Sequence, residues 1–421
     1  MAGLPETRRR QSDEPGLEIP GAAQCLVAPV EPWHGRSNGL TPGRLPPYRC
    51  RMHRRTASAA VLTACLVSAL LTAVPRSAPA SSPQWNAAAA AAYLDGRMGW
   101  WLTWPNAQRD HDTACVSCHT ALPYALARPA LRGALADRAL PAAERRMLEH
   151  VVKRVTMWKD VEPFYPDQLR GLPKTSESRA TEAILNALIL STRDAQTGSL
   201  SDDARQAFAN LWPLQFKAGD LAGAWTWLNF HNEPWEANAS PYFGNALAAL
   251  AIGTAPGGYA ASPDLQDRLA LLQRYLQAGV EKESLYNRLT VLWASGKWPT
   301  LLTAVQRQAI VQAALEKQQD DGGWTLASLS DWKRADGTPL DSASDGLATG
   351  LATLALQQAG VPRADARLGR GLAWLSAHQD AATGMWPASS LNKRRDPASD
   401  VGKFMTDAAT AYAVLSLTNE R

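Results

Sequence analysis

Two kinds of helical segment alternate along most of the chain, and this alternation constrains the fold more than any other feature. One kind is apolar nearly all round and rich in small residues, whereas the other is amphipathic and charged. A helix that is apolar on every face must be buried, and an amphipathic helix can cover it with one face turned to solvent. The apolar segments are residues 121–131 and 243–253 and those around Ala180-Thr181, Ala348-Thr349 and Ala409-Thr410.

The charged segments recur between the apolar ones. They are residues 88–102, 143–159, 201–211, 263–279, 300–317 and 364–377. One charged and one apolar helix together take roughly 50 to 60 residues, and the apolar members should start near 113, 176, 236, 284, 341 and 404. Helix pairs that share a continuous core are typical of repeat architectures. We find no strand pattern, and the sequence predicts an all-α fold with six helix pairs in an outer and an inner ring.

Turns after the charged helices carry a second repeat. Residues 318–324 have the form Q-x-x-x-G-x-W, residues 379–386 repeat it with one insertion, and Gln215, Gly219 and Trp225 look like a decayed third copy. Glycine can take a positive φ where a helix ends, and the glutamine amide can satisfy free carbonyls there. The chain resembles the squalene-hopene cyclase and terpenoid cyclase superfamily in these QW motifs, over most of residues 143–421. The resemblance implies an (α/α)6 toroid.

The chemistry of that superfamily is not matched by this sequence. The D-x-D-D cluster with which cyclases protonate isoprenoids is missing, and no cysteine remains for the zinc site of related prenyltransferases. Asp320-Asp321 belongs to a QW turn and should face outward. Asp341 and Asp345 lie four residues apart at the start of an inner helix, where they could cap the helix or take a catalytic role.

Residues 115–119 read Cys-Val-Ser-Cys-His and constrain the chemistry. C-x-x-C-H is the spacing at which two thiols add to the haem vinyl groups while the adjacent histidine reaches the iron. A reversible C-x-x-C redox pair and half of a zinc site are the alternatives, although zinc needs about four ligands. We expect one covalent haem c on Cys115 and Cys118, with His119 as the proximal iron ligand.

The placement of the motif predicts where the haem lies. Asp112-Thr113 resembles a helix N-cap, so residues 115–131 should form the first inner helix, with His119 on the same face as Cys115. The haem would then lie in or over the cavity of the toroid. A separate small cytochrome domain is the alternative, although only about 35 residues separate Ser81 from Cys115.

Residues 52–80 have the pattern of a signal peptide. Basic residues 52–55 precede the uncharged apolar run 57–74, and residues 77–80 end in a small-x-small cleavage pattern. Residues 1–51 would be a mis-assigned extension or a disordered tail, and residues 81–421 the mature haem-bearing toroid. Cys25, Cys50 and Cys65 fall outside the mature part. Residues 62–65 also resemble a lipoprotein box with Cys65 as the lipidated residue, but the apolar run continues past Cys65, so this pattern fits less well than a cleaved signal peptide. Haem c is attached on the oxidising side of the membrane, so we expect a periplasmic or secreted protein without a membrane span after cleavage.

The net charge gives no reason to expect a nucleic-acid partner. The chain carries +4 in total, but ten arginines and five acids lie in residues 1–80, which leaves the mature part near −1. The aromatic cluster of Trp225, Trp227, Phe230, His231, Trp235, Tyr242 and Phe243 could either line a ligand cavity or fill the core.

The sixth position of the iron decides between two functions. Met405, near the start of the last inner helix, is the leading candidate ligand because closure of six pairs would bring it level with the C-x-x-C-H motif. Met157, His111 and His231 are rivals, and Met405 could instead only pack at the helix entry. A filled position favours electron transfer with a redox partner protein. An open position beside the cavity favours oxidation of a small hydrophobic molecule. A binding module whose haem senses redox state or a gas is the third class of function.

Overall fold

The computed structural model describes residues 84–419, and this part of the chain is predominantly α-helical. The expected signal peptide and N-terminal extension lie outside it. Twelve of the thirteen described helices have 10 residues or more; the thirteenth, α4 (Asp167–Arg170), is a single turn. The all-α class predicted from the sequence is confirmed.

The long helices fall into two sets. The apolar set consists of α2 (Ala121–Leu135), α5 (Lys174–Ala195), α7 (Ser240–Thr254), α9 (Leu285–Lys297), α11 (Gly346–Gln358) and α13 (Phe404–Leu417). The charged set consists of α1 (Ala87–Trp101), α3 (Ala142–Thr156), α6 (Asp202–Leu211), α8 (Gln266–Gly279), α10 (Ala304–Glu316) and α12 (Ala366–Ala377). Short 3-10 turns are η1 (Pro105–Ala107), η2 (Trp212–Leu214), η3 (Tyr259–Ala261), η4 (Pro263–Leu265), η5 (Val280–Lys282) and η6 (Leu326–Ser328).

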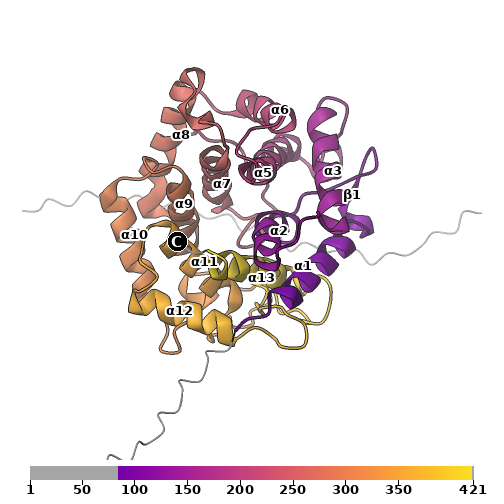
Figure 1. Ribbon diagram of the computed structural model, residues 1–421. Coiled ribbons are helices and arrows are strands. Elements are labelled where there is room, and N and C mark those ends of the chain that lie inside the picture. Colours follow the sequence, from indigo (N-terminus) through magenta and orange to yellow (C-terminus); the bar gives the residue numbers. More distant parts are fainter. Residues whose placement is uncertain (1–83, 420–421) are drawn as a thin grey trace, which may run out of the picture. The chain divides into compact units, whose positions relative to one another are not determined.

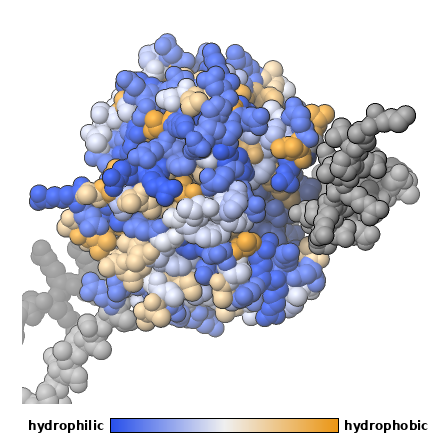
Figure 2. All heavy atoms as spheres, turned by 90° about the vertical axis from the view of Figure 1, so that its right-hand side faces the viewer, coloured by the Kyte–Doolittle hydropathy of each residue, from blue (hydrophilic) through white to orange (hydrophobic). Residues whose placement is uncertain are grey.

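Contacts among the apolar helices form a closed cycle. Each of α2, α5, α7, α9 and α11 packs against the next member of the set, and α13 packs against α2. Helices α7, α11 and α13 are buried on nearly every face, as all-round apolar helices must be. The charged helices lie outside them (Figure 1). The face formed by the right-hand side of Figure 1 is mostly hydrophilic with scattered apolar residues (Figure 2). None of the helices described here is long and apolar enough to cross a membrane.

The first apolar helix begins later than the sequence predicted. Residues 115–120 are not helical, and α2 starts at Ala121. Ser117 explains the delay because its Oγ accepts hydrogen bonds from the backbone N–H groups of Thr120 (3.2 Å) and Ala121 (3.0 Å). The N-cap of α2 is Thr120, so the Asp112-Thr113 cap was wrong. His119 and Cys115 therefore do not share a helical face.

A small hairpin precedes the motif, although the sequence suggested no strands. Strands β1 (Gln108–Arg109) and β2 (Thr113–Ala114) pair antiparallel, with Gln108 opposite Ala114. The turn between them places His111 and Asp112 at φ 53° and 50°, in the left-handed region. Two residues per strand are too few to give an alternating pattern that could be recognised in the sequence.

The QW turns link consecutive charged helices by the same hydrogen bonds. Gln318 Nε2 donates to the carbonyl of Gly322 (2.8 Å) and to that of Arg367 in α12 (2.8 Å). Gln379 does the same to Gly384 (2.9 Å) and to Asn86, the N-cap of α1 (3.0 Å). Each glutamine thus satisfies a turn carbonyl and ties that turn to the following outer helix.

The third QW turn is intact, but its glycine is Gly223 and not Gly219. Gln215 Nε2 donates to the carbonyls of Gly223 (3.0 Å) and of Arg268 in α8 (3.1 Å). Gly223 has φ 97° and lies two residues before Trp225, as Gly322 (φ 93°) does before Trp324. Longer spacing between the glutamine and the glycine hid this copy in the sequence.

The repeated threonines and the acidic pairs have structural roles. Thr349 and Thr410 lie inside α11 and α13 and accept hydrogen bonds from the backbone N–H groups of the two QW tryptophans, at 2.9 and 3.1 Å. Asp345 caps α11 by accepting from Leu347 and Ala348 (both 2.9 Å), which confirms the capping interpretation. Asp341 lies before the helix and pairs with Arg334, and Asp320-Asp321 is exposed as expected.

Gly223→Ala tests the assignment of the third turn. A Cβ there would lie 2.2 Å from the carbonyl oxygen of Leu271, and φ is positive, whereas a Cβ at Gly219 (φ +76°) would meet nothing within 4 Å. We expect Gly223→Ala to lower the free energy of unfolding by about 3 kcal/mol and Gly219→Ala by about 1 kcal/mol, measured by urea denaturation. Equal losses for the two variants would contradict the assignment.

Candidate functional site

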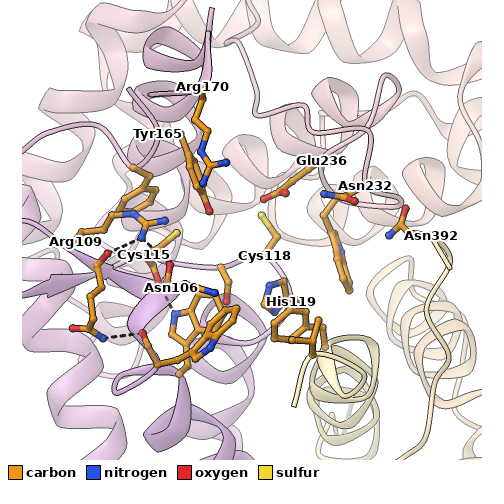
Figure 3. Close-up of a pocket in the computed structure, with 18 of the residues that line it drawn as sticks. Asn106, Arg109, Cys115, Cys118, His119, Tyr165, Arg170, Asn232, Glu236 and Asn392 are labelled. Carbon is orange, nitrogen blue, oxygen red and sulfur yellow. Dashed lines mark hydrogen bonds between the residues drawn. The ribbon is translucent and has the colours of Figure 1, made fainter. Parts of the chain in front are cut away.

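The C-x-x-C-H motif lines a cavity of about 740 Å³. Cys115, Cys118 and His119 reach it from the segment between β2 and α2, and Met405 reaches it from the first turn of α13. The structure therefore brings together all four residues predicted to attach or ligate a haem. Figure 3 shows Cys115, Cys118 and His119 among the side chains that line the cavity. The other walls include Trp101, Trp104, Arg109, Tyr165, Arg170, Trp235, Glu236, Asn392, Arg395 and Phe404.

A buried arginine fixes the hairpin that carries the motif. Arg154 in α3 has a side chain 0% exposed and pairs with Glu182 of α5 (Nε to Oε1, 2.5 Å). It also donates to Thr113 Oγ1 (2.8 Å) and to Asp110 (3.1 Å) at the two ends of the hairpin turn. A buried ion pair of this kind is stable only when its remaining hydrogen bonds are satisfied. The hairpin is thus locked to α3 and α5.

Both cysteines are buried free thiols. Burial raises the pKa of Cys115 to about 11 and that of Cys118 well above its usual value. A reversible redox pair needs a thiol whose pKa is lowered, so this environment disfavours that alternative. Within residues 84–419, no group of three or more His, Cys, Asp and Glu side chains could hold a metal ion.

His119 is held between aromatic rings. Phe404 stacks on the imidazole with ring centroids 3.7 Å apart, and Trp101 meets it edge-on at 5.1 Å. Burial lowers the pKa of His119 to about 3, and the charge of Arg97 acts in the same direction. The imidazole is therefore neutral, which is the form that binds iron.

A hydrogen-bond chain connects His119 to the last apolar helix. His119 Nδ1 lies 2.8 Å from Thr120 Oγ1, which lies 2.6 Å from Asp407 Oδ2 in α13. Asp407 Oδ1 accepts from Tyr93 OH (2.8 Å) and from Arg97 Nε (2.7 Å), both in α1. The sequence does not predict these partners, because nothing in the local pattern around Asp407 distinguishes it from other acids at helix starts.

The rival ligands lie outside the cavity. Met157 is the C-cap of α3, His111 is exposed at the hairpin turn beside Asp110 (3.0 Å), and His231 is exposed at φ 57°. None of them is among the residues that line the cavity, whereas Met405 lines it and is only 4% exposed. The sequence predicted that the last apolar helix lies beside the first, and this is confirmed because α13 packs against α2.

The aromatic cluster mostly fills the core. Trp225, Trp227, Tyr242 and Phe243 are buried away from the cavity, and Trp235 is the member of the cluster that lines it. The Trp235 indole donates to Tyr286 OH (2.8 Å), which fixes the ring beside His119 at a centroid distance of 6.1 Å.

Glu236 adds an unexpected acid to the cavity. Its carboxyl points toward Cys118 (Figure 3), and no hydrogen bond or ion pair to it is found in the described part of the chain. Burial raises the pKa of Glu236 to about 7, although Lys174 partly opposes this shift. Such a group can give or take a proton near neutral pH. The sequence does not predict this role, because Glu236 belongs to the 232–236 loop, more than 100 residues after the motif.

The residues present fit a covalent haem. Two thiols at the correct spacing, a neutral imidazole and a thioether line one cavity, and its volume lies within the roughly 300–1,000 Å³ typical of cofactor sites. Arg109 and Arg170 place guanidinium carbons 4.8 and 5.9 Å from the centre of the Tyr165 ring on one wall. No protein-family model and no curated protein matches the chain.

Arg154→Met tests whether the buried arginine holds the hairpin. The substitution leaves Glu182 buried without its partner, and we expect a loss of roughly 3–5 kcal/mol in the free energy of unfolding. Arg146→Met, on the exposed side of the same helix, is the matched control and should change stability by less than about 0.5 kcal/mol. Chemical denaturation measures both, and a loss below about 1 kcal/mol for Arg154→Met would contradict this role.

Proposed function

We propose that this chain is an exported c-type haem protein whose main task is electron transfer. The observation that carries the proposal is the convergence of Cys115, Cys118, His119 and Met405 on one cavity. Cys115 and Cys118 would form the thioether bonds, His119 would be the proximal ligand and Met405 the sixth ligand. When bound, the haem supplies a one-electron ferric/ferrous couple, and neutral methionine ligation raises its potential. Attachment of haem c takes place outside the cytoplasm, in agreement with the predicted leader.

The proposed scaffold is an (α/α)6 toroid of the terpenoid cyclase type. It is supported by the closed cycle of contacts from α2 through α13 and by three QW turns with equivalent hydrogen bonds. In this arrangement the chain's own residues provide a rigid, partly apolar pocket. Phe404, Trp101 and Trp235 restrict the orientation of the imidazole. A redox partner protein would exchange the electron.

A haem-dependent oxidoreductase that acts on a small hydrophobic molecule is the second candidate. Glu236 favours it, because an unpaired carboxyl with a pKa near 7 is suited to acid-base catalysis and is not needed for electron transfer. In this alternative the sixth position is open, and Met405 only packs at the entry of α13.

Covalent attachment is tested by intact mass. Protein matured in a host that assembles c-type cytochromes should exceed the polypeptide mass by one haem. Cys115→Ala/Cys118→Ala should lose the added mass, whereas Val116→Ala, which keeps the spacing, should retain it. If the haem of the unsubstituted protein extracts into acidic butanone, it is not held by thioether bonds.

Met405→Ala separates the two candidate functions. If Met405 is the sixth ligand, the substitution should abolish the weak long-wavelength band of methionine-ligated ferric haem and allow carbon monoxide to bind readily to the ferrous form. Met157→Ala is the control and should leave both properties unchanged because Met157 lies outside the cavity. An unchanged spectrum and carbon monoxide affinity in Met405→Ala would favour the oxidoreductase.

A further inference from the structure

We propose that Asp407, acting through the hydroxyl of Thr120, is a positioning residue that keeps the proton of His119 on Nδ1 and leaves the lone pair of Nε2 free. The tautomer follows from contacts within the chain itself. Its consequence for iron ligation rests on the proposed function.

The direction of the hydrogen bonds decides the tautomer. Thr120 Oγ1 lies 2.6 Å from Asp407 Oδ2 and 2.8 Å from His119 Nδ1, and the hydroxyl has one proton to give. An ionised carboxylate can only accept, so the Thr120 proton points to Asp407. The hydroxyl oxygen must then accept from His119, and Nδ1 carries the hydrogen.

A buried ion pair with Arg97 stabilises the ionised form of Asp407, although burial raises the pKa of this carboxyl. Arg97 Nε donates to Oδ1 at 2.7 Å, and the two side chains are 7% and 1% exposed. Because a guanidinium remains charged in proteins, a buried one requires a negative partner. The second carboxylate beside Arg97, Asp400 at 2.7 Å, is half-exposed and does not replace this buried contact. Tyr93 OH also donates to Oδ1 (2.8 Å), so this oxygen accepts two hydrogen bonds from the side chains of α1.

The same contacts restrain the orientation of the ring. Nδ1 is tied toward α13, and Phe404 stacks on the imidazole with the ring planes 23° apart. The imidazole therefore has little freedom to exchange its two nitrogens. A ligating histidine whose second nitrogen donates toward a carboxylate is a stronger ligand, and loss of such a partner typically costs 10- to 100-fold in metal affinity or activity.

Histidine NMR of the full chain produced without haem attachment tests the tautomer. In ¹⁵N-histidine-labelled protein, we expect His119 to show a protonated Nδ1 and an unprotonated Nε2. Thr120→Ser keeps the hydroxyl and should preserve this pattern, whereas Thr120→Val keeps the volume and should shift the population toward protonated Nε2. A protonated Nε2 in the unsubstituted protein would mean that the hydrogen-bond chain runs in the opposite direction, and would overturn the proposal.

The haem-loaded protein provides the second measurement. Loss of the relay weakens electron donation to the ferric form, so Thr120→Val should shift the ferric/ferrous equilibrium toward the ferrous form by about tenfold, which corresponds to about 59 mV. Thr120→Ser should stay within a factor of two of the unsubstituted protein. An unchanged potential in Thr120→Val with haem attached would overturn the positioning role. A chain that never acquires haem but shows the Nδ1 tautomer would instead refute the proposed function alone.

Discussion

The packing of α13 against α2 is the contact on which the rest of the structure depends. It joins the last apolar helix to the first and so completes the cycle of contacts among the six apolar helices. The same contact creates the candidate site, because Met405 and Phe404 at the start of α13 come to lie beside the C-x-x-C-H segment before α2. The contact that closes the cycle of apolar helices therefore also forms one side of the cavity.

Charge is buried at two points around this site, and each point fixes a segment that carries a functional residue. Arg154 and Glu182 hold the hairpin before Cys115, while Arg97 and Asp407 hold the Thr120 hydroxyl against His119. Buried ion pairs contribute little net stability because desolvation offsets their attraction. In this site the two ion pairs position the backbone and side chains around the motif.

Local pattern was sufficient to predict the helices. Burial of an entire helix surface leaves a signature in any window of about four turns, so the six charged and six apolar helices could be located to within a few residues, apart from the start of the first apolar helix. That start was wrong because Ser117, inside the motif, binds the N–H groups of Thr120 and Ala121 in a turn before the helix, and such a hydrogen bond depends on a single side chain. The third QW turn was mis-read for a similar reason, since a longer loop moved its glycine to Gly223.

By itself, the sequence determined the all-α class, the alternation of buried and exposed helices and the five-residue motif, because each is expressed by residues close together in the chain. Only the tertiary structure decided which side chains meet that motif. Thr120 and Asp407 are 287 residues apart, and Met405, Trp235 and Glu236 come from segments equally unrelated in sequence. Their meeting depends on how the helices close into one core, and no local periodicity encodes the position of a side chain relative to a distant one.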